Sequence, residues 1–361
     1  MTTEMIWSPP KMAEVDELTT AQMTELVTRF RAAGKPHEKR PVPTRAFGAT
    51  GLELPVVSFG AWQFMHQAQL NSKRQLFGFA RTHTAMRAVA VGTGVLGACG
   101  SAAMVARRPR DTSTAVAGAI GAAVAGALGI CAVACAFNAV VVRNVQEMLR
   151  FAKPLGLLHV ETARLYNTSE QILGRALRGM SATERDGFVF QTKVRPMENV
   201  EEFERTVRLS LRLMDGAPVK LLSFHGINSA QLGEWALRCC TVLERLRDQE
   251  GLLTYIGFST HGDSKVIRSM VDSGRFDYVN IHAHFFGAYT AQDNWPVVQA
   301  AEQRGMGVFI ISPSFQGGRL HNPSLKLSML TAPLTPAEFH ALWLLSQPGV
   351  PTPFNIHRYV D

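Results

Sequence analysis

Residues 157–193, LLHVETARLYNTSEQILGRALRGMSATERDGFVFQTK, decide the fold, because they contain a strand, a helix and a second strand in direct succession. The run LLHVET is apolar and strand-like, SEQILGRALRG has apolar residues at helical spacing, and FVFQTK is a second buried strand. Two strands joined by such a helix are parallel neighbours in one sheet. The stretch therefore predicts a β–α–β unit of an α/β protein.

The same alternation continues on both sides of this unit. Further strand-like runs are VVSFGAW, VKLLSFH, LLTYIGFS, YVNIHAHF and GVFIISPS. Together they give seven parallel strands, and a closed barrel requires one more. The eighth must come from PGVPTPFNIH at 348–357, where prolines remove backbone donors. We predict a (β/α)8 TIM barrel built from residues 41–68 and 144–361, with its closure at the eighth strand in question.

Two regions differ from this pattern in composition. Residues 1–40 are polar and end in a Pro-containing linker, which predicts a flexible N-terminal extension. Residues 69–143 form an Ala- and Gly-rich hydrophobic insert after the first barrel strand. Within it, 86–106 and 112–142 are long and apolar enough for a hairpin of two transmembrane helices. A low-complexity insertion is the alternative, because Leu, Ile, Phe and Val are a minority there.

Charge and cysteine content exclude several function classes. The chain has 361 residues and a formal charge of +8, but its basic residues are scattered, so we do not expect nucleic-acid binding. Its five cysteines fit neither a disulfide framework nor a zinc site. The first residues include several acids and no early apolar run, unlike a signal peptide. We expect a cytoplasmic catalytic domain, membrane-anchored if the insert spans a bilayer.

Ionisable residues stand at the ends of three separate strand patterns. These are Glu161 with Tyr166 after the first, Lys193 in FVFQTK and His225 in VKLLSFH. TIM-barrel enzymes take catalytic residues from the C-terminal ends of several strands, so we expect these side chains to meet. A lysine cation near a tyrosine favours release of the phenolic proton, as carbonyl reduction requires. Each residue alone is more often an ordinary core or surface residue, and their joint order carries the prediction.

The order of several motifs resembles the aldo-keto reductase superfamily. The matching segments are TRAFGATGLELPVVSFGAWQF, ETARLYNTSEQILGRALRG, FVFQTKV, LLSFHGI, YIGFSTHG and ISPSFQGGRL. The resemblance implies an oxidoreductase that uses NADP(H), with NAD(H) as the alternative, to reduce a small aldehyde or ketone. It also implies four roles: Tyr166 as general acid, Lys193 lowering the tyrosine pKa, His225 orienting the carbonyl, and Glu161 pairing with Lys193.

The resemblance further implies a set of cofactor-binding residues. Those expected at the nicotinamide end are Gly60, Trp62, Ser259, Thr260 and Asn280. Those expected along the pyrophosphate are Ser312, Ser314, Gly317, Gly318 and Arg319. Glycines there would allow a close backbone approach, although a plain turn at Gly317 and a loop cap at Ser259 are the ordinary alternatives.

The sequence departs from the family pattern in two places. Glu161 stands where Asp is usual, and reacting groups displaced by about 1 Å can lose roughly a hundredfold in rate. The C-terminal segment, which in the family grips the adenosine phosphate, offers only His357 and Arg358. The alternative function is therefore a catalytically weak, membrane-associated dinucleotide sensor or interaction subunit. The sequence sets neither the substrate nor the oligomeric state.

Three more histidines lie near strand ends. His282 and His284 alternate on one strand and share a face, and His261 follows the preceding strand. No carboxylate or cysteine has a matching spacing, so we predict core or pocket histidines and no metal site.

Overall fold

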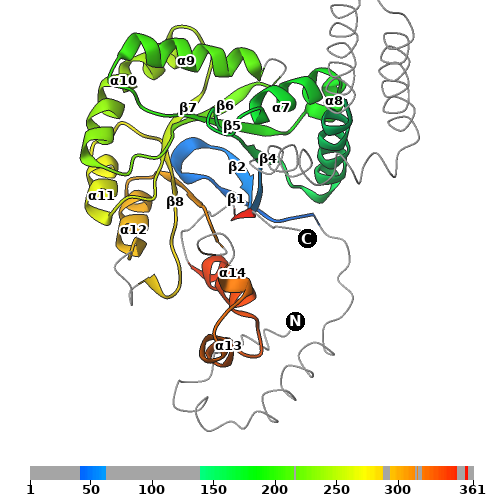
Figure 1. Cartoon of the computed structure of the whole chain (residues 1–361), viewed down its shortest axis with the longest axis vertical. Coiled ribbons are helices and arrows are strands. Elements are labelled where there is room, and N and C mark those ends of the chain that lie inside the picture. Colours follow the sequence, from blue (N-terminus) through cyan, green and yellow to red (C-terminus); the bar gives the residue numbers. More distant parts are fainter. Residues whose placement is uncertain are drawn as a thin grey trace, which may run out of the picture.

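The computed structural model describes residues 41–61, 139–214, 217–287, 293–313, 315, 319–347 and 354–356. Eight parallel strands close into a barrel in the order β10-β3-β4-β5-β6-β7-β8-β9, with helices around it (Figure 1). The strands are β3 (Val57–Gly60), β4 (His159–Glu161), β5 (Val189–Val194), β6 (Val219–Phe224), β7 (Tyr255–Ser259), β8 (Tyr278–Ile281), β9 (Gly307–Ile310) and β10 (Phe354–Ile356). The predicted parallel barrel is confirmed.

The helices follow the strands as the sequence pattern indicated. They are the helix at 139–152, α7 (Ser169–Arg178), α8 (Ala182–Arg185), α9 (Val200–Leu213), α10 (Ala230–Asp248), α11 (Ser264–Asp272), α12 (Trp295–Gln303), α13 (Leu325–Thr331) and α14 (Pro336–Ser346). Side-chain caps define several of their starts: Asn199 for α9, Ser229 for α10 and Asp263 for α11 each accept a backbone N–H of the first turn. Because these caps follow the strand ends closely, the strand-to-helix loops are short.

Side chains alternate along each barrel strand between the interior and the helices. On β5, Phe190 belongs to the apolar core shared with the helices, whereas Gln191 donates to Asn280 across the barrel interior at 2.9 Å. The interior begins with an apolar layer, the floor, made of Phe47, Leu54, Val189, Leu221, Tyr278 and Phe309. Polar side chains lie above this floor, toward the carboxyl ends of the strands, which we call the mouth.

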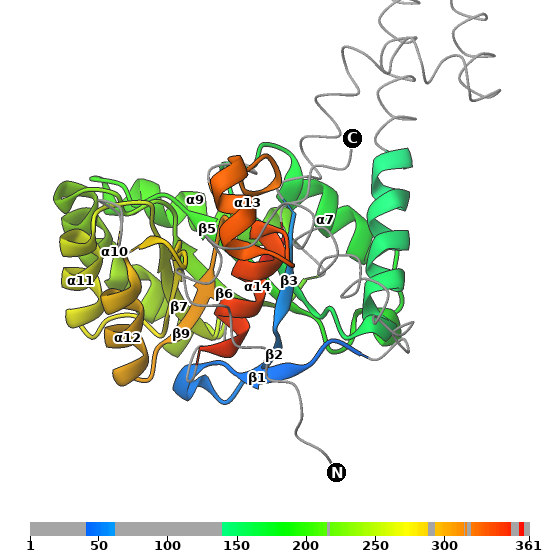
Figure 2. The ribbon, with the colours of Figure 1, turned by 90° about the horizontal axis from the view of Figure 1, so that it is seen from below.

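A hairpin closes the barrel at the floor. Its strands β1 (Thr44–Ala46) and β2 (Glu53–Pro55) are antiparallel, and Gly51 lies in the loop between them with φ 72°. The hairpin lies at one end of the barrel, with α13 at the opposite end (Figure 2). The Phe47 ring packs 4.4 Å from that of Phe309, and a Cβ at Gly307 would lie 2.5 Å from the Phe47 ring. Only glycine at position 307 leaves room for this plug.

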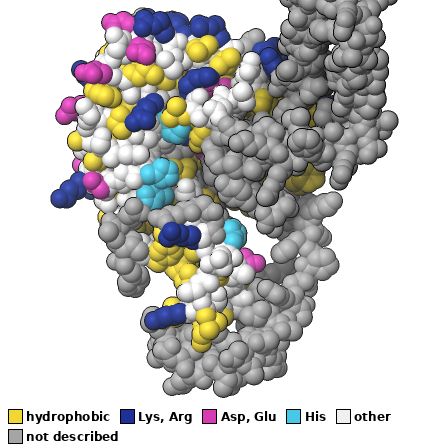
Figure 3. Space-filling view, in the orientation of Figure 1, with side chains coloured by type: hydrophobic (Ala, Val, Ile, Leu, Met, Phe, Trp, Pro, Cys, Tyr) yellow, Lys and Arg dark blue, Asp and Glu magenta, His cyan; other side chains and the backbone are white. Residues whose placement is uncertain are grey.

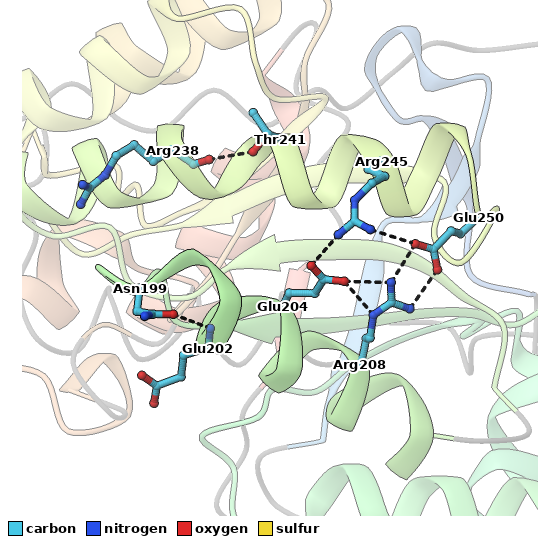
Figure 4. Close-up of polar contacts among 8 residues, drawn as sticks. All are labelled: Asn199, Glu202, Glu204, Arg208, Arg238, Thr241, Arg245 and Glu250. Atoms are coloured by element: carbon cyan, nitrogen blue, oxygen red, sulfur yellow. Dashed lines mark hydrogen bonds and ion pairs between the residues drawn. The ribbon is translucent and has the colours of Figure 1, made fainter.

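An ion-pair network joins the outer helices that flank the strands of the site. Arg208 on α9 donates to both carboxylate oxygens of Glu250, at 2.9 and 2.7 Å, and to Glu204 at 2.9 Å (Figure 4). Arg245 on α10 pairs with the same two carboxylates. Exposed pairs of this kind stabilise little one by one, so the network chiefly fixes the spacing of α9 and α10.

The eighth strand exists but is short. Three residues of β10 pair with β3, whereas only Phe354 pairs with β9, opposite Ile310. The barrel closure that the sequence left in question is therefore present, although the last strand adds few backbone contacts on its β9 side.

The predicted insert falls largely outside the described residues. Its last residues, 139–143, belong to the helix that ends at 152 and packs Val141 and Val145 into the main core. Residues 1–40, the span 86–106 and 112–138 of the second span lie outside the described part, so their roles stay predictions. Within the described residues, none of the helices combines the length and apolarity needed to cross a bilayer.

Candidate active site

Adjacent strands deliver the predicted catalytic residues to the mouth. Strands β4, β5 and β6 are neighbours, with Glu161 paired opposite Gln191 and Lys193 opposite Ser223. Glu161 and Lys193 face the interior, and His225 continues the interior side of β6 one residue beyond its end. The turn after β4 is tied to β5 by the Arg164 N–H, which donates to the Lys193 carbonyl at 2.8 Å. This turn carries Tyr166 back over the strand ends.

The lysine is the centre of the group. Its Nζ donates to the Tyr166 hydroxyl oxygen at 3.3 Å and lies 4.8 Å from the centre of that ring. It also donates to the Thr162 carbonyl at 3.3 Å and forms an ion pair with Glu161. Both charged side chains of this pair are almost wholly buried. The longer side chain of Glu161 therefore still reaches the lysine that the usual Asp would hold.

Burial determines the proton affinities in this group. It raises the pKa of Tyr166 to about 12, so the phenol is protonated at neutral pH. This is opposite to the lowering expected from Lys193, because desolvation of the phenolate outweighs the neighbouring cation. Burial also lowers the pKa of Lys193, while the Glu161 carboxylate opposes that effect by favouring the ammonium.

His225 completes the group as a neutral imidazole. Its ring meets the Tyr166 ring edge to face, with centres 5.6 Å apart. Burial, and then the charges of Lys193, His261 and Arg195, lower its pKa to about 3. Its buried Nδ1 has no hydrogen-bond partner among the described residues. A neutral imidazole has one N–H to donate, which suits it to hold a carbonyl oxygen beside the phenol.

Comparison with known proteins places this arrangement in a recognised fold. Neither a protein-family model nor a curated protein matches the chain. Among solved structures, the holo form of an aldo-keto reductase from Bacillus halodurans matches with a TM-score of 0.53 and 16% identity, over 87% of this chain and 86% of that one. This chain has the aldo-keto reductase fold.

Two further structures support the same conclusion. A thermostable aldo-keto reductase in complex with the inhibitor epalrestat has a TM-score of 0.51 and 17% identity, over 87% of this chain and 89% of the other. A Pseudomonas aeruginosa protein proposed to be an aldo-keto reductase has a TM-score of 0.52 and 16% identity, over 86% and 88% of the two chains. The resemblance predicted from the sequence motifs is confirmed for the fold.

Three of the five residues expected at the nicotinamide end lie on barrel strands, namely Gly60, Ser259 and Asn280. Gly60 ends β3 beside Glu161. Ser259 accepts the Gly226 N–H at 3.1 Å and keeps its own hydroxyl hydrogen for another acceptor. Asn280 is fully buried; its Oδ1 accepts from Gln191, and its Nδ2 has no partner among the described residues. These spare donors suit a carboxamide oxygen, so Ser259 and Asn280 fit a nicotinamide.

Thr260 has a different place from the one expected. Its hydroxyl donates to the Ile227 carbonyl at 2.7 Å and accepts the Gly262 N–H at 2.9 Å. The hydroxyl therefore ties two loops together, the ordinary structural role for such a residue. Ser312 follows β9 with φ 52°, and Arg319 is exposed at the start of a short 3-10 helix, Arg319–His321. The other predicted cofactor residues, Trp62, Ser314, Gly317 and Gly318, lie outside the described residues.

Several interior residues were missed at the sequence level. His159 and Gln191 lie two residues before Glu161 and Lys193 on the same strands, and both are fully buried beneath them. The His159 ring stacks on Phe309, with centres 4.6 Å apart, and burial lowers its pKa to about 3. Strand alternation alone would have placed both side chains inside the barrel.

The three further histidines gather near the mouth. His261 stacks on His282 with ring centres 5.4 Å apart, and His284 lies 6.0 Å from His282. His284 Nδ1 is 3.2 Å from Nε2 of the buried His340 on α14. Within the described residues, no group of three or more His, Cys, Asp or Glu side chains could hold a metal ion. The cluster is therefore a set of packed and mouth-lining imidazoles.

Proposed function

We propose that the chain is an NAD(P)H-dependent oxidoreductase that reduces a small aldehyde or ketone, with Tyr166 as general acid. The contact between Lys193 Nζ and the Tyr166 hydroxyl, backed by the Glu161 carboxylate, carries this proposal. A phenol held against a buried lysine is suited to deliver a proton where negative charge develops. The aldo-keto reductase fold supports the same reaction class.

The nicotinamide cofactor, when bound, supplies the hydride that the carbonyl carbon accepts. The chain supplies the proton. As charge builds on the carbonyl oxygen, Tyr166 donates its hydroxyl proton, and the neighbouring Lys193 ammonium stabilises the phenolate left behind. Glu161 keeps the ammonium in place through its ion pair. The proton then returns to Tyr166 from solvent, because the side chain is only half-buried.

His225 and the spare donors supply orientation. The neutral His225 ring, edge to face with Tyr166, directs the carbonyl oxygen toward the phenol. Ser259 and Asn280 would hold the carboxamide of the nicotinamide through the donors described above, and the exposed Arg319 would meet a phosphate. We propose NADPH as the preferred cofactor.

The test is turnover of purified protein with NADPH and a panel of small aldehydes and ketones, followed by loss of NADPH absorbance. Tyr166→Phe should reduce turnover by roughly 10²-fold or more, since one proton donor is removed. NADPH binding, followed by its fluorescence, should persist in this variant. Tyr255→Phe is the matched control, because that hydroxyl bonds to the Thr50 carbonyl on the floor side. Equal turnover by Tyr166→Phe and wild type would reject the assigned role.

A further inference from the structure

An exposed arginine, Arg195, follows the strand that lies between the one leading to the proposed proton donor and the one leading to the carbonyl-orienting histidine. Arg195 comes one residue after β5, and strand alternation directs it to the same side as Lys193. The residue before it, Val194, accepts the His225 N–H at 2.9 Å, so Arg195 follows directly on the backbone contact between β5 and His225. Its charge is also among the causes of the lowered pKa of His225. Arg195 is exposed, and it forms no ion pair with any carboxylate of the described residues.

The acidic side chains of the neighbouring segments either bind other partners or form no ion pair with Arg195. Glu161 pairs with Lys193, and Glu170 pairs with Arg164 at 2.6 Å. Asp263 caps α11 by accepting the N–H groups of Lys265 and Val266 at 3.0 Å. Glu198, three residues beyond Arg195, is exposed and makes no ion pair with it in the described chain. Among the described residues, the positive charge of Arg195 is therefore not neutralised by an ion pair.

A second basic side chain faces the same space from β7. His261 is exposed, yet desolvation by the surrounding protein lowers its pKa, so the ring is a neutral hydrogen-bond donor at neutral pH. Its ring is stacked on His282, whose backbone carbonyl accepts from Asn294 at 2.9 Å. Figure 3 shows His side chains gathered on this face of the barrel. His261 is thus held in position before any ligand binds.

The strand order separates this space from the phosphates of a bound cofactor. In the closed order, β5 is four strands away from β9 and so directly across the barrel. The loop after β9 holds the residues that we assign to the pyrophosphate. Arg195 lies instead between β4, which leads to Tyr166, and β6, which leads to His225. It therefore lies beside the strands that carry the proposed proton-transfer residues and away from the loop that we assign to the pyrophosphate.

We propose that the substrate is a carbonyl compound with a carboxylate at its far end, bound by Arg195 with His261 as a second donor. This inference rests on the proposed function. A guanidinium binds a carboxylate through two parallel N–H···O bonds. Its single permanent charge matches a carboxylate better than a phosphate dianion.

Two matched aldehydes test this inference: 4-carboxybenzaldehyde and its uncharged methyl ester, methyl 4-formylbenzoate. With NADPH, wild-type kcat/KM for the acid should exceed that for the ester by about tenfold or more, as expected for a charge-assisted pair. Arg195→Gln should bring the ratio of the two values close to one, and Arg195→Lys should restore part of it. His261→Gln should lower the ratio by a smaller factor.

The control removes the same charge elsewhere. Arg212 is an exposed arginine in the last turn of α9, at the end of the helix away from the mouth, and Arg212→Gln should keep the wild-type ratio. Equal kcat/KM for acid and ester in wild type would overturn the substrate class while leaving the proposed function standing. An unchanged ratio in Arg195→Gln would overturn the assignment to Arg195. No reduction of either aldehyde would overturn both proposals.

Discussion

At the scale of single residues, stability depends most on the buried Lys193–Glu161 ion pair, because loss of one partner leaves the other charge unpaired. Lys193→Met should lower the free energy of unfolding by about 3–5 kcal/mol, because it leaves the Glu161 carboxylate buried without its ammonium. Turnover should also be lost. Urea denaturation monitored by circular dichroism measures the first effect.

The double variant Lys193→Met, Glu161→Leu separates stability from chemistry. Replacing a buried ion pair by apolar residues is often neutral for stability, so the double variant should recover most of the loss. Its turnover should stay absent. A single variant as stable as wild type would contradict the assigned burial of the pair.

His159 makes stability depend on pH. Its folded-state pKa is about 3, against an ordinary value of 6.5, so below pH 6.5 only the unfolded chain binds the proton. Its contribution to stability is therefore complete above pH 6.5 and is lost as the pH falls toward 3. Between these limits the loss is about 1.4 kcal/mol per pH unit.

Replacing the His159 ring by a side chain that does not titrate should make the free energy of unfolding depend less on pH. The free energy of unfolding of His159→Gln should fall less steeply than that of wild type between pH 6 and pH 4, by roughly 1.4 kcal/mol per unit. Chemical denaturation at several pH values gives both slopes. Parallel curves for the two proteins would show that His159 is not held neutral in the fold.

At the scale of elements, the hairpin plug depends on one ring. Phe47→Ala should cost about 3–5 kcal/mol, since Phe47 is fully buried against Phe309 and Tyr278 and leaves a cavity at the floor. Phe151 offers a matched control, because it is 69% exposed, and Phe151→Ala should change stability by less than about 0.5 kcal/mol. Denaturant midpoints compare the two. Similar losses in both variants would mean that the hairpin does not seal the barrel.

The elements also show how far sequence patterns reach. The hairpin loop contains Gly51, because a bend with positive φ selects glycine. The strand predicted for YVNIHAHF ends at Ile281, since apolar character alone does not mark where pairing with β9 stops. Helix α13 was not predicted, because its seven residues are too few for a clear helical period.

The candidate site was likewise predicted only in part from the sequence. The positions of the strand ends were enough to predict that Tyr166, Lys193 and His225 meet, because parallel neighbouring strands have their carboxyl ends at one mouth. The direction of the Tyr166 pKa shift was wrong, since it depends on burial that no pattern reveals. Arg195 was missed for a related reason. A single arginine after a strand gives no functional signal until the structure shows whether an acidic side chain pairs with it.

At the scale of the whole molecule, barrel closure depends on three residues. A chain truncated after residue 353 would lose β10, whose pairs with β3 and β9 join the two ends of the strand order. Two strand edges would then be unpaired, which weakens the fold and favours association between molecules. The melting temperature should fall by several degrees, as expected for a loss of about 1–2 kcal/mol in a large domain.

A second truncation, after residue 356, is the control because it keeps β10. It should retain the wild-type melting temperature and remain monodisperse to the same degree as the full chain, measured by circular dichroism and size-exclusion chromatography. Since β10 meets β9 at Phe354 alone, the β3 side carries most of the closure. A proline at Asn355 in the full chain, within the β3 pairing, should therefore destabilise almost as much as removal of the strand. If the chains ending at residues 353 and 356 have the same melting temperature, the helices hold the barrel closed and β10 contributes nothing to its stability.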